Sequence, residues 1–234
     1  MNRLALALLA LLVAGGPAAA ATTQAPSGFS ATGQPASYDV NGKAYVVGGY
    51  RGAKWGMTVT EVRGAIARDF PGAQVGTDTR DPASHTTLVV VATPHLEPGP
   101  GPMAVTYIFG AASGRLIHVN LDWQAAHATG ADRDALTVAG SRVVADFIAY
   151  YWKLMSVARG VPVGPHSLVL FSGSDDNGGI VEVRLQGVGY SVKTADGQRI
   201  EMPPPPAGAQ ALLHVGFARS ATEADVYAIK PGEF

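Results

Sequence analysis

The pattern of hydrophobic and polar positions first predicts a short amphipathic helix over 59–70. Four apolar residues recur there at helical spacing: Val59, Val62, Ile66 and Phe70. Thr58 precedes this stripe and Glu61 stands three residues later, which is the spacing of a capping box in which each side chain satisfies a backbone N–H of the other residue. Pro71 and Gly72 then end the helical pattern.

A second and longer helix is predicted over 132–158. Asp132 stands at its start, and Gly160 and Pro162 follow its end. The apolar residues at helical spacing are Leu136, Ala139, Val143, Phe147, Tyr150, Tyr151 and Leu154. Because other apolar residues widen this arc, we expect the helix to lie at the centre of the core.

Two β-hairpins are predicted from alternating residues on either side of glycine-containing turns. The first joins 103–109 to 115–123, and the second joins 167–171 to 179–187. Along 115–123, one face holds Leu116, His118, Asn120 and Asp122, and the other holds Ile117, Val119, Leu121 and Trp123. Further strands are predicted at 86–93, 198–202, 212–218 and 225–229.

This element order predicts an α+β fold made of two helix-plus-antiparallel-sheet units, 45–128 and 129–234, with the second packed on the first. The segments that begin at Phe109 and at Phe171 echo each other in their turns and following strands. A tandem duplication and a chance match between two generic hairpins both explain this echo.

The N-terminal segment 1–21 has the organisation of a cleavable signal peptide. Arg3 lies before an apolar run, Gly15 to Pro17 break it, and small residues follow up to position 21. The run of about ten apolar residues is half of the ~20 that a spanning helix needs. We therefore expect a periplasmic or secreted protein with a flexible lead-in over 22–44 and no transmembrane segment in the mature chain.

Charge and cysteine content narrow the classes of function. The 234 residues include 17 Lys and Arg against 18 Asp and Glu, and this near-neutral balance argues against a nucleic-acid partner. The absence of cysteine excludes disulfides, thiol catalysis and thiolate metal sites.

The segment from Tyr50 to Val62, YRGAKWGMTVTEV, resembles an aromatic-Gly-Met turn that enters a capped helix in small exported bacterial proteins. It is similar to the helix-on-antiparallel-sheet units of the outer-membrane assembly lipoprotein group and of the β-lactamase-inhibitor-protein-like fold. The segment 224–234, ADVYAIKPGEF, resembles the closing motif of an uncharacterised family of proteobacterial exported proteins. These resemblances imply the architecture of the units and carry no chemistry.

Candidate catalytic and metal-binding motifs are weak. None of the six histidines stands in a HxH, HxxxH or HExxH spacing, and Gly-x-Ser-x-Gly is absent. His118 and Asp122 form the best local pair, but a strand places them about 13 Å apart, so a third element is needed for them to share an ion. The segment 175–179, DDNGG, faintly resembles a calcium loop, and a hairpin turn explains it better. We therefore predict no catalytic residue, metal or cofactor.

Three functions remain, in order of preference. The first is a non-enzymatic periplasmic module that binds a protein or another envelope component. The second is a protein that binds a small apolar molecule or lipid between helix 132–158 and the sheet, in a pocket lined by Phe147, Tyr151 and Trp123. The third is a hydrolase with a dispersed site, which two histidines converging with a carboxylate would favour. The candidate binding residues are Arg51, Lys54, Trp55, His118, Asn120 and Asp122.

Overall fold

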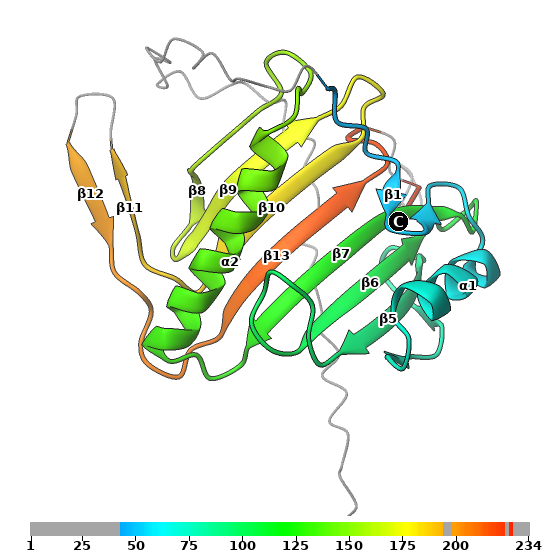
Figure 1. Cartoon of the computed structure of the whole chain (residues 1–234), viewed down its shortest axis with the longest axis horizontal. Coiled ribbons are helices and arrows are strands. Elements are labelled where there is room, and N and C mark those ends of the chain that lie inside the picture. Colours follow the sequence, from blue (N-terminus) through cyan, green and yellow to red (C-terminus); the bar gives the residue numbers. More distant parts are fainter. Residues whose placement is uncertain (1–42, 194–197, 223–224, 227–234) are drawn as a thin grey trace, which may run out of the picture.

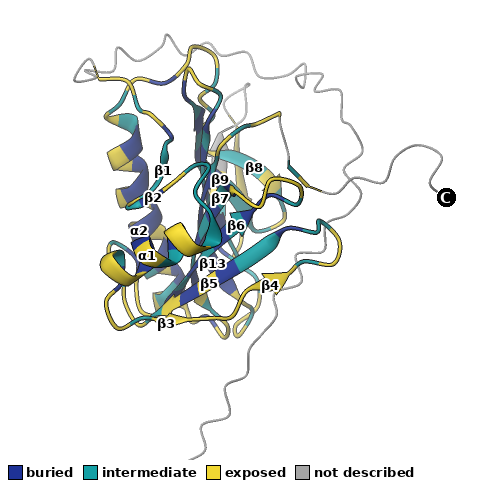
Figure 2. Cartoon of the chain, turned by 90° about the vertical axis from the view of Figure 1, so that its right-hand side faces the viewer, coloured by how far each residue is buried: buried dark blue, intermediate teal, exposed yellow. Residues whose placement is uncertain are grey.

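A nine-stranded antiparallel sheet forms the body of the protein, and two helices lie on one of its faces (Figures 1 and 2). The computed structural model describes residues 43–193, 198–222 and 225–226. From one edge to the other, the strands are β3 (Gln74–Val75), β5 (Thr87–Thr93), β6 (Met103–Phe109), β7 (Leu116–Ala125), β13 (Ala211–Ala218), β10 (Ile180–Gln186), β9 (Ser167–Ser174) and β8 (Val161–Gly164). A ninth strand, β4 (Thr79–Arg80), also pairs with β5. The predicted α+β class is confirmed, with the sheet as the larger part.

The strands follow the same pattern of chain order on the two sides of the central pair, β7 and β13: in each half, the last strand of the half is central and the earlier strands lie farther out. Outward from the centre, one side runs β7, β6, β5 and the other runs β13, β10, β9. Each half of the chain supplies one helix and then these strands, so the two predicted units share one sheet. This order makes β7 equivalent to β13, whereas the sequence echo aligns β7 with β10. The echo therefore does not align strands in equivalent positions.

The first helix, α1 (Val59–Asp69), matches its prediction. Thr58 Oγ1 accepts from the Glu61 backbone N–H at 3.3 Å, and Glu61 Oε2 accepts from the Thr58 N–H at 2.7 Å. Val62 and Ile66 are buried, and Phe70 caps the C-terminus from a buried position. The helix is thus fixed by local signals at both ends.

The second helix, α2 (Gly130–Ile148), begins earlier and ends ten residues sooner than predicted. Its N-cap is Thr129, and Asp132 is the partner of Thr129 in a capping box instead of the first residue. The helix packs on β13, β10 and β9, where Gly140 faces the sheet: a methyl group placed on it would lie 2.7 Å from Leu170 Cδ1 and 3.2 Å from Leu213 Cδ1. The absence of a side chain allows this close approach.

The predicted continuation of α2 over 149–158 is wrong, because Trp152 and Tyr151 make contacts outside a helix and Leu154 is not buried. Trp152 turns back into the core and donates from Nε1 to the Phe147 carbonyl at 2.9 Å. Tyr151 pairs with Ala44 in an isolated bridge. Leu154 is 80% exposed, so its apolar character marks no buried helix position.

The core lies between the helices and the sheet. Tyr45, Phe147, Trp152 and Phe171 form a contacting aromatic cluster there, with Tyr45 stacked on Trp152 at 4.7 Å between ring centroids. Two short hairpins complete the described chain: β1 (Gly49–Tyr50) with β2 (Ala53–Lys54), and β11 (Tyr190–Lys193) with β12 (Arg199–Met202).

The predicted hairpins, the strand at 86–93 and the strands at 198–202 and 212–218 agree with the structure within a few residues. The face predicted for Leu116 is wrong. Leu116 was expected on the face of His118, but it is fully buried and pairs with Phe109 where the register between β6 and β7 shifts. The predicted signal peptide 1–21, nearly all of the lead-in 22–44 and most of the strand 225–229 lie outside the described residues. Among the residues that the structure describes, no helix combines the length and apolar character needed to cross a bilayer.

Candidate functional site: a polar cluster on the helix-free face

The face of the sheet opposite the helices carries a group of polar side chains at its centre. On β7, His118, Asn120 and Asp122 alternate with the buried residues Val119 and Leu121. Since side chains alternate between the two faces of a strand, the polar set points away from the helices. This confirms the predicted alternation over 118–123.

Two further strands bring polar residues to the same face. Across β7, β13 and β10, Asp122 stands opposite His214, which stands opposite Arg184. In the next row, Asn120 stands opposite Gly216, which stands opposite Glu182. We call His118, Asn120, Asp122, Glu182, Arg184, His214 and Gly216 the polar cluster.

Asp122 fixes the orientation of the His214 ring. The Oδ1 atom of Asp122 lies 2.7 Å from Nδ1 of His214, and both side chains are less than one quarter exposed. A carboxylate accepts only, so Nδ1 of His214 carries the proton and donates it to Asp122. In the neutral ring, Nε2 of His214 is then left with a free lone pair.

His118 is held in its neutral form by its surroundings. Burial is the main cause that lowers the pKa of His118 from 6.5 to about 4, the proximity of His214 lowers it further, and the Asn120 amide acts in the opposite direction. His118 is therefore a neutral imidazole at physiological pH.

Gly216 lies where three of the polar side chains come together. A methyl group placed on Gly216 would lie 3.0 Å from Nε2 of His214, and 3.5 Å from both Nε2 of His118 and Oδ1 of Asn120. Three polar atoms from β7 and β13 therefore lie within 3.5 Å of one point at the glycine. Any side chain at position 216 would occupy this point.

Two buried polar atoms of the cluster have no geometrically defined hydrogen bond to any other described residue. They are Oδ1 of Asn120 and Nε of Arg184. Arg184 directs Nη2 to Oε1 of Glu182 at 2.5 Å, so only part of its donor capacity is used. A buried polar atom without a partner costs about 1–3 kcal/mol. A ligand that offers a donor to Asn120 and an acceptor to Arg184 would remove this cost.

No family model, curated protein or solved structure matches the chain. Any function proposed for the chain therefore depends on its own sequence and on the geometry of its described residues.

The six predicted binding residues fall into two groups on opposite faces. His118, Asn120 and Asp122 lie in the polar cluster. His118 and Asp122 are too far apart on β7 to share a ligand directly, and β13 is the neighbouring strand that lies beside both. The sequence pattern did not indicate His214 and Gly216 of β13 or Glu182 and Arg184 of β10 as members of a site. A signal for His214 was present, because it is the only polar side chain in the strand ALLHVGFA.

Arg51, Lys54 and Trp55 belong to the β1–β2 hairpin and take no part in the polar cluster. The Arg51 guanidinium lies 4.7 Å from the centroid of the Phe70 ring and donates to the Asp69 carbonyl at 2.9 Å. Trp55 donates from Nε1 to the Val47 carbonyl. Arg51 and Trp55 thus fix the hairpin against α1 and the preceding segment.

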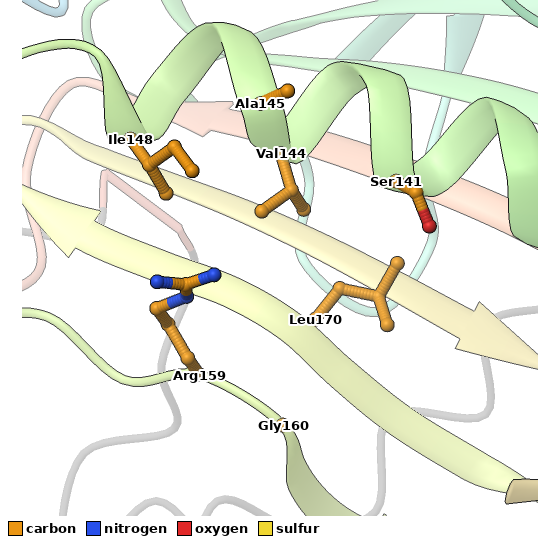
Figure 3. A pocket seen from close by; sticks show the side chains of 7 residues that line it. All are labelled: Ser141, Val144, Ala145, Ile148, Arg159, Gly160 and Leu170. Atoms are coloured by element: carbon orange, nitrogen blue, oxygen red, sulfur yellow. The ribbon is translucent and has the colours of Figure 1, made fainter.

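A groove of about 430 Å³ lies between α2, β9 and the segment before β8 (Figure 3). It is lined by Ser141, Val144, Ala145, Ile148, Arg159, Gly160 and Leu170. The groove lies between α2 and the sheet, where a pocket was expected, but none of the three expected lining residues lines it. Trp123 and Phe147 are buried in the core, and Tyr151 lines neither this groove nor the cluster.

The segment 175–179 is a closed turn, as predicted. The buried Asp175 carboxylate accepts from the backbone N–H groups of Val47, Asn177 and Gly179 at 2.8 to 2.9 Å. Its oxygens are thus directed to the backbone. Within the described ranges, no three His, Asp or Glu side chains are arranged to hold a metal ion by themselves.

Proposed function

We propose that the protein is a non-enzymatic binding module of the cell envelope, exported by its N-terminal segment, and that it recognises a partner through the polar cluster. The observation that carries this proposal is a pair of buried atoms, Oδ1 of Asn120 and Nε of Arg184, that have no hydrogen bond to another described residue. They lie on the sheet face opposite the two described helices. Native structures keep few such atoms without a reason.

The position of these two atoms limits the partner. Asn120 is on β7 and Arg184 is on β10, with β13 between them, so their strands lie roughly 10 Å apart at the usual strand spacing. One atom needs a donor and the other needs an acceptor. An extended polypeptide offers both at this spacing through its backbone and polar side chains. We therefore propose an envelope protein with a polar contact segment as the partner.

Site-specific photo-crosslinking in the producing cells tests this function. Thr106 stands opposite Asn120 on β6, whereas Val138 is 52% exposed on α2 and lies on the other face. A photoreactive residue at position 106 should give one protein adduct of defined mass, and the same residue at 138 should not. The double substitution Asn120→Ala with Arg184→Ala should remove the adduct. Labelling of both positions alike, or an adduct that survives the double substitution, contradicts the proposal.

The groove supports a second candidate, the binding of an acyl chain with an anionic head group. Figure 3 shows Val144 and Ile148 extending from α2 toward Leu170, while Arg159 reaches in from the neighbouring segment. Apolar walls with one cationic group suit a fatty acid, whose carboxylate would pair with the guanidinium. Displacement of a fluorescent fatty acid should fail in Arg159→Ala and persist in Arg142→Ala, which removes an exposed arginine of α2. Equal displacement in both variants would rule out a fatty-acid site in which Arg159 binds the carboxylate.

The hydrolase remains the third candidate. His214 is hydrogen-bonded to the Asp122 carboxylate, and Nε2 of His118 and Nε2 of His214 both lie within 3.5 Å of the Cβ position of Gly216. This is part of the arrangement expected to favour a hydrolase. A His–Asp pair supplies two of the three members of a nucleophile-activating triad. Among the described residues, however, no serine or threonine hydroxyl is hydrogen-bonded to His214. The pair therefore supports binding better than acyl transfer.

We also propose that the two halves arose by tandem duplication of a helix-plus-sheet unit like those of the outer-membrane assembly lipoproteins. The matching strand order on the two sides of β7 and β13 supports this origin. The polar cluster would then lie at the junction of the two copies.

A further inference from the structure

We propose that the space above Gly216 is a binding site for one divalent transition-metal ion of the zinc, nickel and copper class, held by Nε2 of His118, Nε2 of His214 and Oδ1 of Asn120. This inference uses the same face as the proposed function, but it does not depend on a protein partner. It adds the chemical class of a ligand that the polar cluster itself selects.

The first argument is convergence. Three potential ligand atoms lie within 3.5 Å of one point above Gly216. They come from two strands whose register places Asn120 directly opposite Gly216. Metal–nitrogen bonds of about 2.0–2.1 Å place the ion close to Nε2 of His214 and require the His118 ring to rotate toward it. A side chain at position 216 would stand between the three atoms and hinder this movement, and glycine has none.

The second argument is the polarity of the converging atoms. Nε2 of His214 presents a lone pair, because Nδ1 donates its proton to Asp122. Oδ1 of Asn120 is an acceptor and is buried. Two acceptors therefore meet at the same space, an arrangement that an electron-pair acceptor such as a metal ion stabilises. His118 can present its Nε2 lone pair to the same ion by adopting the Nδ1–H tautomer.

The third argument is the support behind His214. Metal-ligating histidines commonly donate their second ring N–H to a carboxylate, which fixes the tautomer and increases the basicity of the ligating nitrogen. Asp122 does this for His214 at 2.7 Å. The hydrogen bond between Asp122 and His214 is present without a metal ion, so the His214 ring is already oriented before the ion binds.

The ligand types indicate which metals fit. Imidazole nitrogens suit zinc, copper and nickel, whereas magnesium and calcium prefer sets made of oxygens. Two imidazoles and one amide oxygen leave at least one position of a four-coordinate ion open. Water or a side chain of the partner would occupy that position on the solvent side of the sheet. We expect moderate affinity, because three ionisable ligands are not available in the described part of the chain.

Calorimetric titration of the untagged, chelator-treated protein with ZnCl₂, repeated with NiCl₂, tests the proposal. We expect one ion per chain. His118→Ala and His214→Ala should each weaken binding by at least about 100-fold, and Asp122→Asn by about 10–100-fold. His95→Ala is the matched control and should change nothing, because His95 pairs with Glu97 on an exposed loop.

Gly216→Ala provides a variant that removes no ligand. Its methyl group fills the space between the three atoms, so zinc binding should be lost while the circular dichroism spectrum of the folded protein is retained. A lack of saturable binding in the wild-type protein overturns the inference. Zinc binding that persists unchanged in Gly216→Ala or in the His118→Ala, His214→Ala double variant overturns it as well.

The same preparations separate this inference from the proposed function. Photo-crosslinking at position 106 can be repeated with and without EDTA. An adduct that persists in EDTA, together with a lack of zinc binding, would remove the metal site and leave the partner proposal standing. Zinc binding without any adduct would support the metal site and contradict the partner proposal.

Discussion

Nδ1 of His214 lies 2.7 Å from Oδ1 of Asp122, although 92 residues separate the two in the chain. The contact joins β7 to β13 at the centre of the sheet, where the two halves of the protein meet. It fixes the orientation of one imidazole on the helix-free face. The same pair therefore contributes both to the stability of the fold and to the candidate site.

The first prediction concerns the energy of this pair. A double-mutant cycle with Asp122→Ala and His214→Ala, measured by urea unfolding in EDTA at pH 7, should give a coupling energy of about 1 kcal/mol. The value is below that of a fully buried charge-assisted bond because both side chains are partly exposed. The pair His95 and Glu97, whose side chains are both more than half exposed, should give less than about 0.5 kcal/mol. Equal coupling in the two cycles would show that the Asp122–His214 contact is not specially stabilised.

The second prediction concerns pH. The pKa of His118 is lowered from 6.5 to about 4 in the folded protein, mainly by burial. Between these values the unfolded chain binds a proton that the folded chain does not, so stability is full above pH 6.5 and falls as the pH decreases to 4. The full shift corresponds to roughly 3 kcal/mol, and partial exposure reduces the expected loss to about 1–2 kcal/mol.

His118→Gln isolates this contribution, because glutamine is polar and does not titrate. Urea unfolding in EDTA should show that the wild-type protein loses about 1–2 kcal/mol more than the variant between pH 6.5 and pH 4. His127→Gln is the control and should follow the wild type. Parallel pH profiles for wild type and His118→Gln would mean that His118 titrates normally in the folded state.

Local signals predicted the parts of the fold that local interactions determine. The helix after Thr58 was predicted because its capping box lies within four residues of sequence. The end of α2 could not be predicted in the same way. Trp152 and Tyr151 continue the helical pattern, and only their contacts with the core and with Ala44 remove them from it.

The candidate site, too, could be predicted only where local sequence signals determine it. Alternation along 115–123 correctly placed His118, Asn120 and Asp122 on one face. Nothing near them in sequence indicates that β13 is the neighbouring strand, since α2 and the strands β8 to β12 separate β7 from β13 in chain order. His214 and Gly216 therefore enter the site only through the sheet topology.

The residues around Trp55 stay a predicted binding surface, and the structure adds local contacts for two of them. They were predicted to form a binding surface because their chemistry suits one. In the structure, the Phe70 ring contacts Arg51 and the Val47 carbonyl accepts from Trp55. Cationic and aromatic side chains close together in sequence thus stabilise a local hairpin here.

The third prediction concerns the turn 175–179. Asp175→Ala should lower the free energy of unfolding by about 2–4 kcal/mol, because three backbone N–H groups lose a buried carboxylate acceptor. Asp176→Ala removes the neighbouring, exposed carboxylate and should change stability by less than about 0.5 kcal/mol. Urea unfolding measures both variants. Similar values for the two would show that Asp175 is not the acceptor that closes the turn.

The fourth prediction concerns a buried arginine that supports the fold away from the polar cluster. Arg133 of α2 is 7% exposed. It donates to the carbonyl oxygens of Ala128, Thr129, Pro206, Ala209 and Gly187, at distances from 2.5 to 3.5 Å. It thereby joins the start of α2 to the loops on both sides of the β11–β12 hairpin.

Arg133→Met keeps much of the side-chain volume and removes all of these donors. We expect it to destabilise the protein by about 3 kcal/mol or more, since several carbonyl groups lose a charged donor in a buried place. Arg133→Lys should recover only part of this loss, because an ammonium group cannot reproduce the planar set of donors. Arg142→Met, at an exposed position of the same helix, controls for the loss of charge and should be nearly neutral. If lysine restored full stability in urea unfolding, the guanidinium geometry would not be what holds the two loops to α2.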